Sequence, residues 1–212
     1  ESGRDLSPRV VHGAGPSPVI GAAATAIGIA LALLLGLGAA LGGRIVDFGV
    51  NRLLEVMFAF PGLLLALLVI TVYGPGVVTS TIAVGLATAP GYARIIRAQT
   101  RSVAVAPYVE SAVVLGWSRR RILGRHILPN AVLPVIVLVT LGVGQAIVWA
   151  SALSYLGLGA EPPSAEWGAM LFAGKNYLAT AWWMTFFPGL AIVTAAAATT
   201  VLGRALQRGG AR

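Results

Sequence analysis

The chain has 212 residues, of which 57% are hydrophobic and only 10% are charged, and its formal net charge is +8. Soluble domains carry about 25% charged residues, and a chain of this length could not hide so much apolar surface in a water-soluble core. The composition therefore excludes an ordinary soluble domain and predicts an integral membrane protein with the lipid bilayer as partner. The absence of cysteine excludes disulfides and cysteine-ligated metal sites within the chain.

Five segments are candidates to cross the roughly 30 Å of bilayer hydrocarbon, which takes about 20 apolar residues. In chain order, the predicted spans are Val19–Leu41, Leu53–Tyr73, Val77–Ala93, Ala131–Leu153 and Trp183–Gly203. Pro61 should kink the second of them. We therefore predict an all-α fold, with an extracytoplasmic segment at residues 1–17 and one transmembrane domain at residues 18–212.

The distribution of basic residues predicts the orientation of these spans. Twelve of the fifteen lysines and arginines lie in the loops Gly42–Arg52 and Arg94–Asn130 and in the tail after Gly203, which share one side. The other side holds Arg4, Arg9 and Lys175. Because cytoplasmic loops carry the excess of positive charge, we expect the C-terminus in the cytoplasm. The same distribution accounts for the net charge without nucleic acid as a partner.

The chain shows no energy source of its own. Proton relays need ionisable groups at membrane depth, and the predicted spans hold almost none, since Glu55 lies near a cytoplasmic end. A phosphate-binding P-loop needs lysine followed by serine or threonine, whereas the single lysine, Lys175, precedes Asn176. No nucleophile–base pair is visible either. We expect a non-enzymatic subunit without cofactors, and any ATP and magnesium would be bound by partner subunits.

The longest predicted cytoplasmic connection, Arg94–Asn130, reads as short helices around a break. Pro107 suits the start of a helix over Tyr108–Leu115, and Gly116 suits the left-handed geometry found just past a helix end. The small residues near this turn would let it enter a groove in a partner protein. A basic segment attracted to anionic lipid would explain the arginines equally well.

The residues Glu110-Ser111-Ala112, Gly116 and His126-Ile127-Leu128-Pro129-Asn130 resemble the EAA loop of ABC importer permeases, and the last five resemble its dipeptide/oligopeptide/nickel branch. In that family this loop forms a coupling helix that docks on an ATPase subunit. The resemblance therefore implies that Arg94–Asn130 is a coupling loop. The residues that it places at the contact are Glu110, Ser111, Ala112, Leu115 and Gly116. Ser111 replaces the usual alanine, and His126 is a branch marker.

Other segments that resemble the family are Gly3–Gly21, Ala59–Leu67, Ser154–Leu171 and Phe187–Ile192. Gly15, Pro16 and Pro18 depart from its pattern and should break a helix there, and Arg204 replaces a frequent acidic residue. The resemblance implies a type I ABC importer permease fold in a bacterial plasma membrane, with a sixth span upstream. The implied partners are a second, different permease, two ATP-binding subunits and an extracytoplasmic solute-binding protein.

The loop at residues 154–182 is predicted to lie outside, and the resemblance implies contact with the binding protein through Glu161, Glu166 and Lys175. Trp182 and Trp183 also suit simple anchoring at the membrane interface.

Few polar residues occur within the spans. The candidates for the translocation path are Gln145, Thr140 and Ser151. An amide at membrane depth needs a hydrogen-bond partner or water, so we favour an interhelical hydrogen bond for Gln145 over a place in the path.

We expect the cargo to be di- or oligopeptides. The alternatives are an importer of nickel or another small solute, and a channel-like structural subunit that has no ATPase partner.

Overall fold

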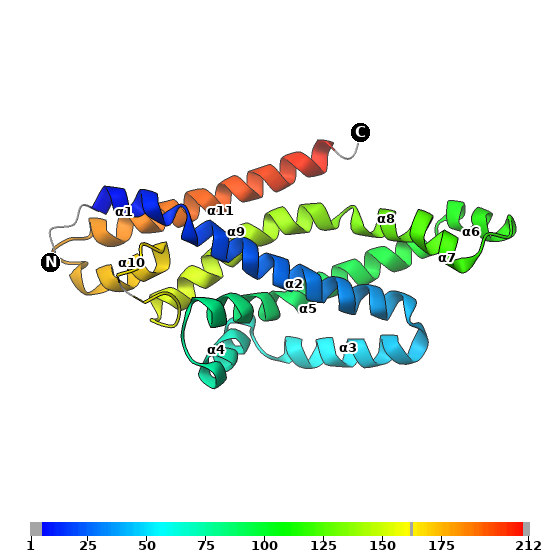
Figure 1. The fold of residues 1–212 in the computed structure, drawn as a ribbon, viewed down its shortest axis with the longest axis horizontal. Helices are drawn as coiled ribbons and strands as arrows, with labels where there is room; N and C mark the ends of the chain where they lie inside the picture. Colours follow the sequence, from blue (N-terminus) through cyan, green and yellow to red (C-terminus); the bar gives the residue numbers. More distant parts are fainter. Residues whose placement is uncertain (1–5, 162, 210–212) are drawn as a thin grey trace.

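The computed structural model describes residues 6–161 and 163–209, and within these ranges the chain is helical without any strand (Figure 1). Arg4, Pro162 and Arg212 therefore lie outside the described residues. The helices are α1 (Leu6–Gly13), α2 (Pro16–Leu41), α3 (Gly43–Ala59), α4 (Gly62–Tyr73), α5 (Val77–Ala104), α6 (Pro107–Val114), α7 (Arg119–Ile122), α8 (Leu128–Val132), α9 (Val135–Tyr155), α10 (Trp167–Gly174) and α11 (Trp183–Gly209). A π-helical turn covers Leu123–Ile127 and a 3₁₀ turn covers Lys175–Tyr177.

The long helices α2, α5, α9 and α11 run along the long axis of the molecule (Figure 1). Helices α6 and α7 lie at one end, whereas α1 and α10 lie at the other, as the predicted sidedness of the two loops requires. Because α5 packs against α2, α4 and α9, it is the central helix of the bundle.

Glycine lets α2 and α5 approach closely. A Cβ atom on Gly28 would lie 3.0 Å from the carbonyl oxygen of Gly85, and one on Gly85 would lie 2.8 Å from that of Ala24. The surrounding core is rich in alanine, which serves the same purpose. Many large apolar side chains, such as Leu34 and Ile45, point outward instead, as expected where lipid or other subunits cover the surface.

Among the described residues, three helical stretches are long and apolar enough to cross a membrane, namely Leu6–Leu41, Arg119–Tyr155 and Trp183–Gln207. A fourth crossing results if α3 and α4 form one bent span. These contain four of the five predicted spans. The fifth, Val77–Ala93, forms the first part of α5, which is long enough but not apolar enough to qualify. A central helix faces other helices, so it can hold polar residues such as Ser80 and Thr81.

The predicted kink at Pro61 is a complete break, with 90° between α3 and α4. Phe60 adopts an extended conformation, with φ −98° and ψ 131°, because a residue before proline avoids helical geometry. The predicted break near Gly15 is also present, since α1 ends at Gly13 and α2 begins at Pro16.

Candidate functional site

Helix α6 is an exposed helix within Arg94–Asn130, the predicted coupling loop. Ala106 is extended, and Pro107 occupies the first helical turn, where its missing N–H costs no hydrogen bond. Glu110 lies in the first turn, where a negative charge is favourable next to the helix N-terminus. The sequence-predicted helix over Tyr108–Leu115 is therefore confirmed to within one residue at each end.

Gly116 closes α6 through a pair of backbone hydrogen bonds. The N–H of Trp117 donates to the carbonyl of Ala112 (3.1 Å), and that of Gly116 donates to Val113 (2.9 Å). This is the Schellman arrangement, which requires a left-handed residue, and Gly116 has φ +75°. A Cβ atom there would meet nothing within 4 Å, so backbone conformation alone selects glycine.

The coupling loop has a small core of its own, made of Val103, Val109, Ala112, Ile122 and Ile127. Ala112 is 4% exposed and faces this core. Its predicted place at a partner contact needs correction, because the side chain holds the loop together instead.

The other four residues predicted for the contact, Glu110, Ser111, Leu115 and Gly116, are exposed. Val114 and Leu115 are 87% and 73% exposed. The tip of the loop, residues 110–116, thus presents apolar side chains that nothing in the described chain covers.

An aromatic cluster braces the tip against the rest of the loop. The ring of His126 lies 5.1 Å from that of Trp117 and 6.1 Å from that of Tyr108, and the guanidinium of Arg121 stacks on Trp117 at 4.0 Å. His126 lies in the π-helical turn, and its Nε2 atom is buried without a hydrogen-bond partner among the described residues. These contacts indicate that His126 packs the loop.

The three polar residues predicted for the translocation path lie in different surroundings on α9. The hydroxyl of Tyr92, on α5, donates to the side-chain oxygen of Gln145 at 3.4 Å, which supports the interhelical bond that we favoured. Gln145 is nevertheless exposed. Thr140 packs against Gly203 of α11 and donates to the carbonyl of Val137. Ser151 is 4% exposed, and its hydroxyl has no partner in the described chain.

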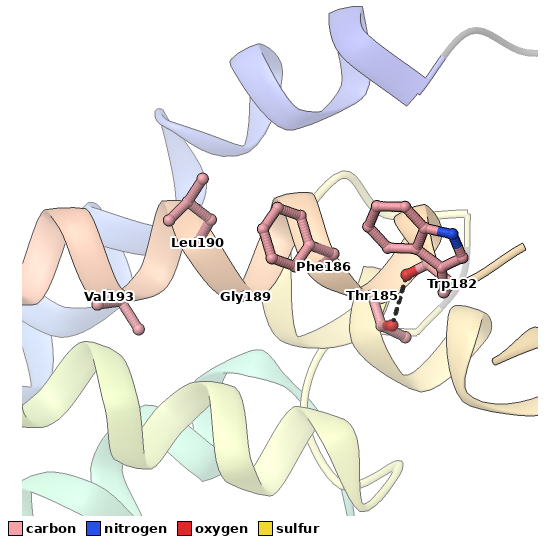
Figure 2. Close-up of a pocket in the computed structure, with 6 residues that line it drawn as sticks. All are labelled: Trp182, Thr185, Phe186, Gly189, Leu190 and Val193. Carbon is pink, nitrogen blue, oxygen red and sulfur yellow. Dashed lines mark hydrogen bonds between the residues drawn. The ribbon is translucent and has the colours of Figure 1, made fainter.

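Two shallow hollows flank the first half of α11. One, of about 530 Å³, is lined by Trp182, Thr185, Phe186, Gly189, Leu190 and Val193 (Figure 2). The second, of about 340 Å³, lies between α9, α10 and α11 and includes Ser151 and Tyr155. Gly189 lines both hollows, and because it has no side chain it leaves a depression in the surface of the helix. The first hollow is formed by Trp182 and one helix alone, so it is an open surface.

In the external loop the structure separates the three predicted contact residues. Glu166 is 2% exposed, and its two carboxylate oxygens accept hydrogen bonds from the N–H groups of Gly168 and Ala169, both at 2.8 Å. Its predicted contact with a binding protein needs correction, since the carboxylate caps α10. Lys175 lies 3.9 Å over the ring of Phe172, and Glu161 is exposed.

The loop at residues 154–182 is tied to residues 9–17 by several hydrogen bonds. The hydroxyl of Ser17 accepts from the N–H of Trp167 (3.0 Å), and the indole of Trp167 donates to the carbonyl of Val10 (2.9 Å). Arg9 donates to the carbonyls of Pro163 and Ser164.

Sequence reasoning missed an ion cluster between α3 and α5. Arg97 makes two hydrogen bonds to Asp47, from Nε to Oδ1 (2.6 Å) and from Nη2 to Oδ2 (3.0 Å), and Arg101 Nη2 lies 2.7 Å from Oδ2. Asn51, one turn along α3, donates to Oδ1 at 2.9 Å. The available signal was the spacing of the two arginines, which places both on one face of a helix.

Comparison with known proteins reveals a family over most of the chain. The sequence pattern of the family described as "Binding-protein-dependent transport system inner membrane component" matches residues 28–210. The chain is 37% identical over 207 residues to the di/tripeptide transport system permease protein DppC of Pseudomonas aeruginosa, covering 98% of this chain and 68% of that protein. It is 41% identical over 205 residues to the glutathione transport system permease protein GsiD of Shigella flexneri, covering 97% and 68%.

The fold also matches a solved membrane transporter. A chain of the inward-facing MetNI methionine ABC transporter superposes with a TM-score of 0.73, covering 94% of this chain and 95% of that one. The sequence identity is 13%, so this likeness concerns the fold.

Proposed function

Because the chain belongs to the family of binding-protein-dependent transport system inner membrane components, and is a permease subunit of an ABC importer, we propose that it conducts di- or oligopeptides across the bacterial plasma membrane. The relatives support the cargo, since DppC is named for di- and tripeptides and GsiD for glutathione, itself a peptide. No charged side chain occurs in α2, in α9 or in the part of α11 before Arg204. A path without fixed charges suits peptides of varied sequence.

We propose that the channel is completed by a second, different permease. Two ATP-binding subunits drive the importer from the cytoplasm, and an extracytoplasmic binding protein delivers the cargo. The C-terminus then lies in the cytoplasm with α6, and α10 faces the binding protein. Glu161 and Lys175 remain proposed contacts, whereas Glu166 is dropped because it is buried.

The observation that carries the proposal is the tip of the coupling loop. This tip is an ordered helix that ends at a left-handed glycine. Its apolar residues Val114 and Leu115 are exposed, whereas the opposite side of the helix packs on the small core of the loop. A segment that only approached anionic lipid would need basic residues, not an ordered apolar tip. An exposed apolar patch marks an interaction surface, and the absence of basic residues from positions 110–116 favours a protein over anionic lipid as the partner.

The test compares two arginine substitutions in the same loop. Gly116→Arg places a bulky cation at a positive-φ position on the tip, whereas Gly124→Arg adds the same charge at an exposed position with free space around it and ordinary backbone. In the reconstituted importer, we expect Gly116→Arg to abolish stimulation of ATP hydrolysis by loaded binding protein and Gly124→Arg to leave it intact. Stronger membrane attachment by both variants with undisturbed stimulation would instead establish the lipid interpretation.

The cargo is tested by uptake. Proteoliposomes with the complete importer should accumulate labelled di- and tripeptides in the presence of ATP, and free nickel should not compete. Uptake of nickel without uptake of peptides would assign the chain to the alternative substrate class.

A further inference from the structure

Asp47 is held by two arginines of the central helix, at the end of that helix that leads into the coupling loop. Arg101 stands three residues before α5 ends at Ala104, and α6 begins at Pro107. A side chain on α3 is therefore attached to the base of the loop. Arg94, two turns earlier on α5, stacks on Phe58 of α3 at 4.1 Å and extends the same contact line.

This cluster differs from an ordinary surface ion pair. The side chains of Asp47 and Arg97 are only 18% and 22% exposed, whereas Arg52 and Glu55, paired within α3, are 73% and 54% exposed. Bidentate arginine–carboxylate pairs hold orientation as well as distance, and partial burial strengthens them. Asp47 accepts from Arg97, Arg101 and Asn51, so the carboxylate is fully engaged.

Apolar packing holds α3 at few points. Leu54 is its only buried residue and packs in a core shared with α2 and α5, whereas its outward side carries exposed Ile45 and Phe48. Helix α4, beyond the 90° bend, packs on α5 directly through Ala66 and Ile70. The Asp47 cluster is therefore a main polar contact that orients α3, but not α4, against α5.

We propose that Asp47 is a positioning residue for ATP-driven transport, which makes α3 follow the coupling loop when the ATPase subunits move it. The proposal rests on the proposed function, since it assumes that the loop docks on those subunits. Hydrolysis would occur without Asp47, but the motion would no longer reach α3. The expected defect is therefore in the yield of transport per ATP, not in docking.

The first experiment uses Asp47→Asn in the complete reconstituted importer, with Glu55→Gln as the matched control on the same helix. Allosteric couplings are commonly worth factors of about 5 to 150, so we expect peptide transported per ATP to fall about 5-fold or more in Asp47→Asn. The ATPase subunits should remain bound, Glu55→Gln should behave as wild type, and Asp47→Glu should restore part of the yield. A wild-type yield in Asp47→Asn, or loss of the ATPase subunits from it, would overturn the proposal.

A second experiment replaces the ionic link by a covalent one. The chain has no cysteine, so Asp47→Cys with Arg101→Cys can be joined by a bifunctional thiol reagent cleaved by reductant, with cysteine-free partner subunits. Transport per ATP should be low before linking, recover on linking and fall again after reduction. No recovery on linking would show that α3 need not move with α5. Failure of the docking proposal has its own signature, undisturbed stimulation in Gly116→Arg, so the two failures can be told apart.

Discussion

Each end of the bundle has an eight-residue helix, α6 at one end and α10 at the other. The chain itself packs around α10, whereas it leaves most of α6 exposed. Helix α10 buries Trp167, Gly168, Ala169, Met170 and Gly174, and it is capped by Glu166. Helix α6 buries only Val109 and Ala112 and turns its remaining apolar side chains outward. A short helix is marginal by itself, so its stability has to come from packing. The chain supplies that packing at α10, and at α6 it leaves apolar side chains exposed, as the proposed docking on an ATPase subunit requires.

The largest expected effect on stability is at α10, the well-packed helix. Glu166→Ala should lower the free energy of unfolding by about 2–3 kcal/mol, because the buried N–H groups of Gly168 and Ala169 lose their acceptors. Thermal unfolding of the purified importer in detergent measures this, with exposed Glu161→Ala as control. Equal midpoints for the two variants would contradict the capping role and weaken the contrast between the ends.

Gly116→Ala, at the exposed helix α6, should lower the free energy of unfolding by less, about 1–2 kcal/mol, through the unfavourable left-handed conformation alone. Because no atom lies within 4 Å of the new Cβ, no clash adds to this cost. Gly116→Asn should be milder, since asparagine tolerates positive φ. Unfolding midpoints of both variants give the comparison, and an asparagine variant less stable than the alanine one would refute the conformational explanation.

Val114→Ser should change the stability of the isolated subunit least, by under about 0.5 kcal/mol, because the side chain is 87% exposed. Its affinity for the ATPase subunit should nevertheless fall, which a binding titration measures. Ser102→Ala, an exposed change at the end of α5, serves as control. Unaltered affinity in Val114→Ser would remove the main distinction between α6 and α10.

Local chemistry was predictable from the sequence where it depends on neighbouring residues. Gly116, Pro107 and Pro61 act through their own backbone geometry, and the structure confirms the helix end, the helix start and the kink that they predict. Burial depends on which elements meet, and it is harder to predict. Ala112 and Glu166 both read as exposed contact residues, yet Ala112 faces the loop core and Glu166 meets Ser17 across 149 residues of sequence.

The Asp47 cluster was missed for the same reason. Its members are 50 residues apart, and each arginine alone was explained by the charge of a cytoplasmic loop. Val77–Ala93 was predicted as a span, but α5 as a whole is less apolar than the other long helices and packs against α2, α4 and α9.

The bend at Pro61 restricts whether lipid, water or protein can contact this part of the subunit. A helix end leaves backbone groups without partners in their own helix, and the bend brings two such ends together: the last carbonyls of α3 and the first N–H groups of α4. The hydrogen bonds of α4 begin with the N–H of Leu65, which donates to the carbonyl of Pro61. Hydrocarbon offers no hydrogen bonds, and irregular backbone at membrane depth is tolerated only against protein or water. If α3 and α4 form one bent span, the surface at Phe60 and Pro61 must therefore face water or another protein, and the lipid annulus must lie elsewhere around the circumference of the subunit.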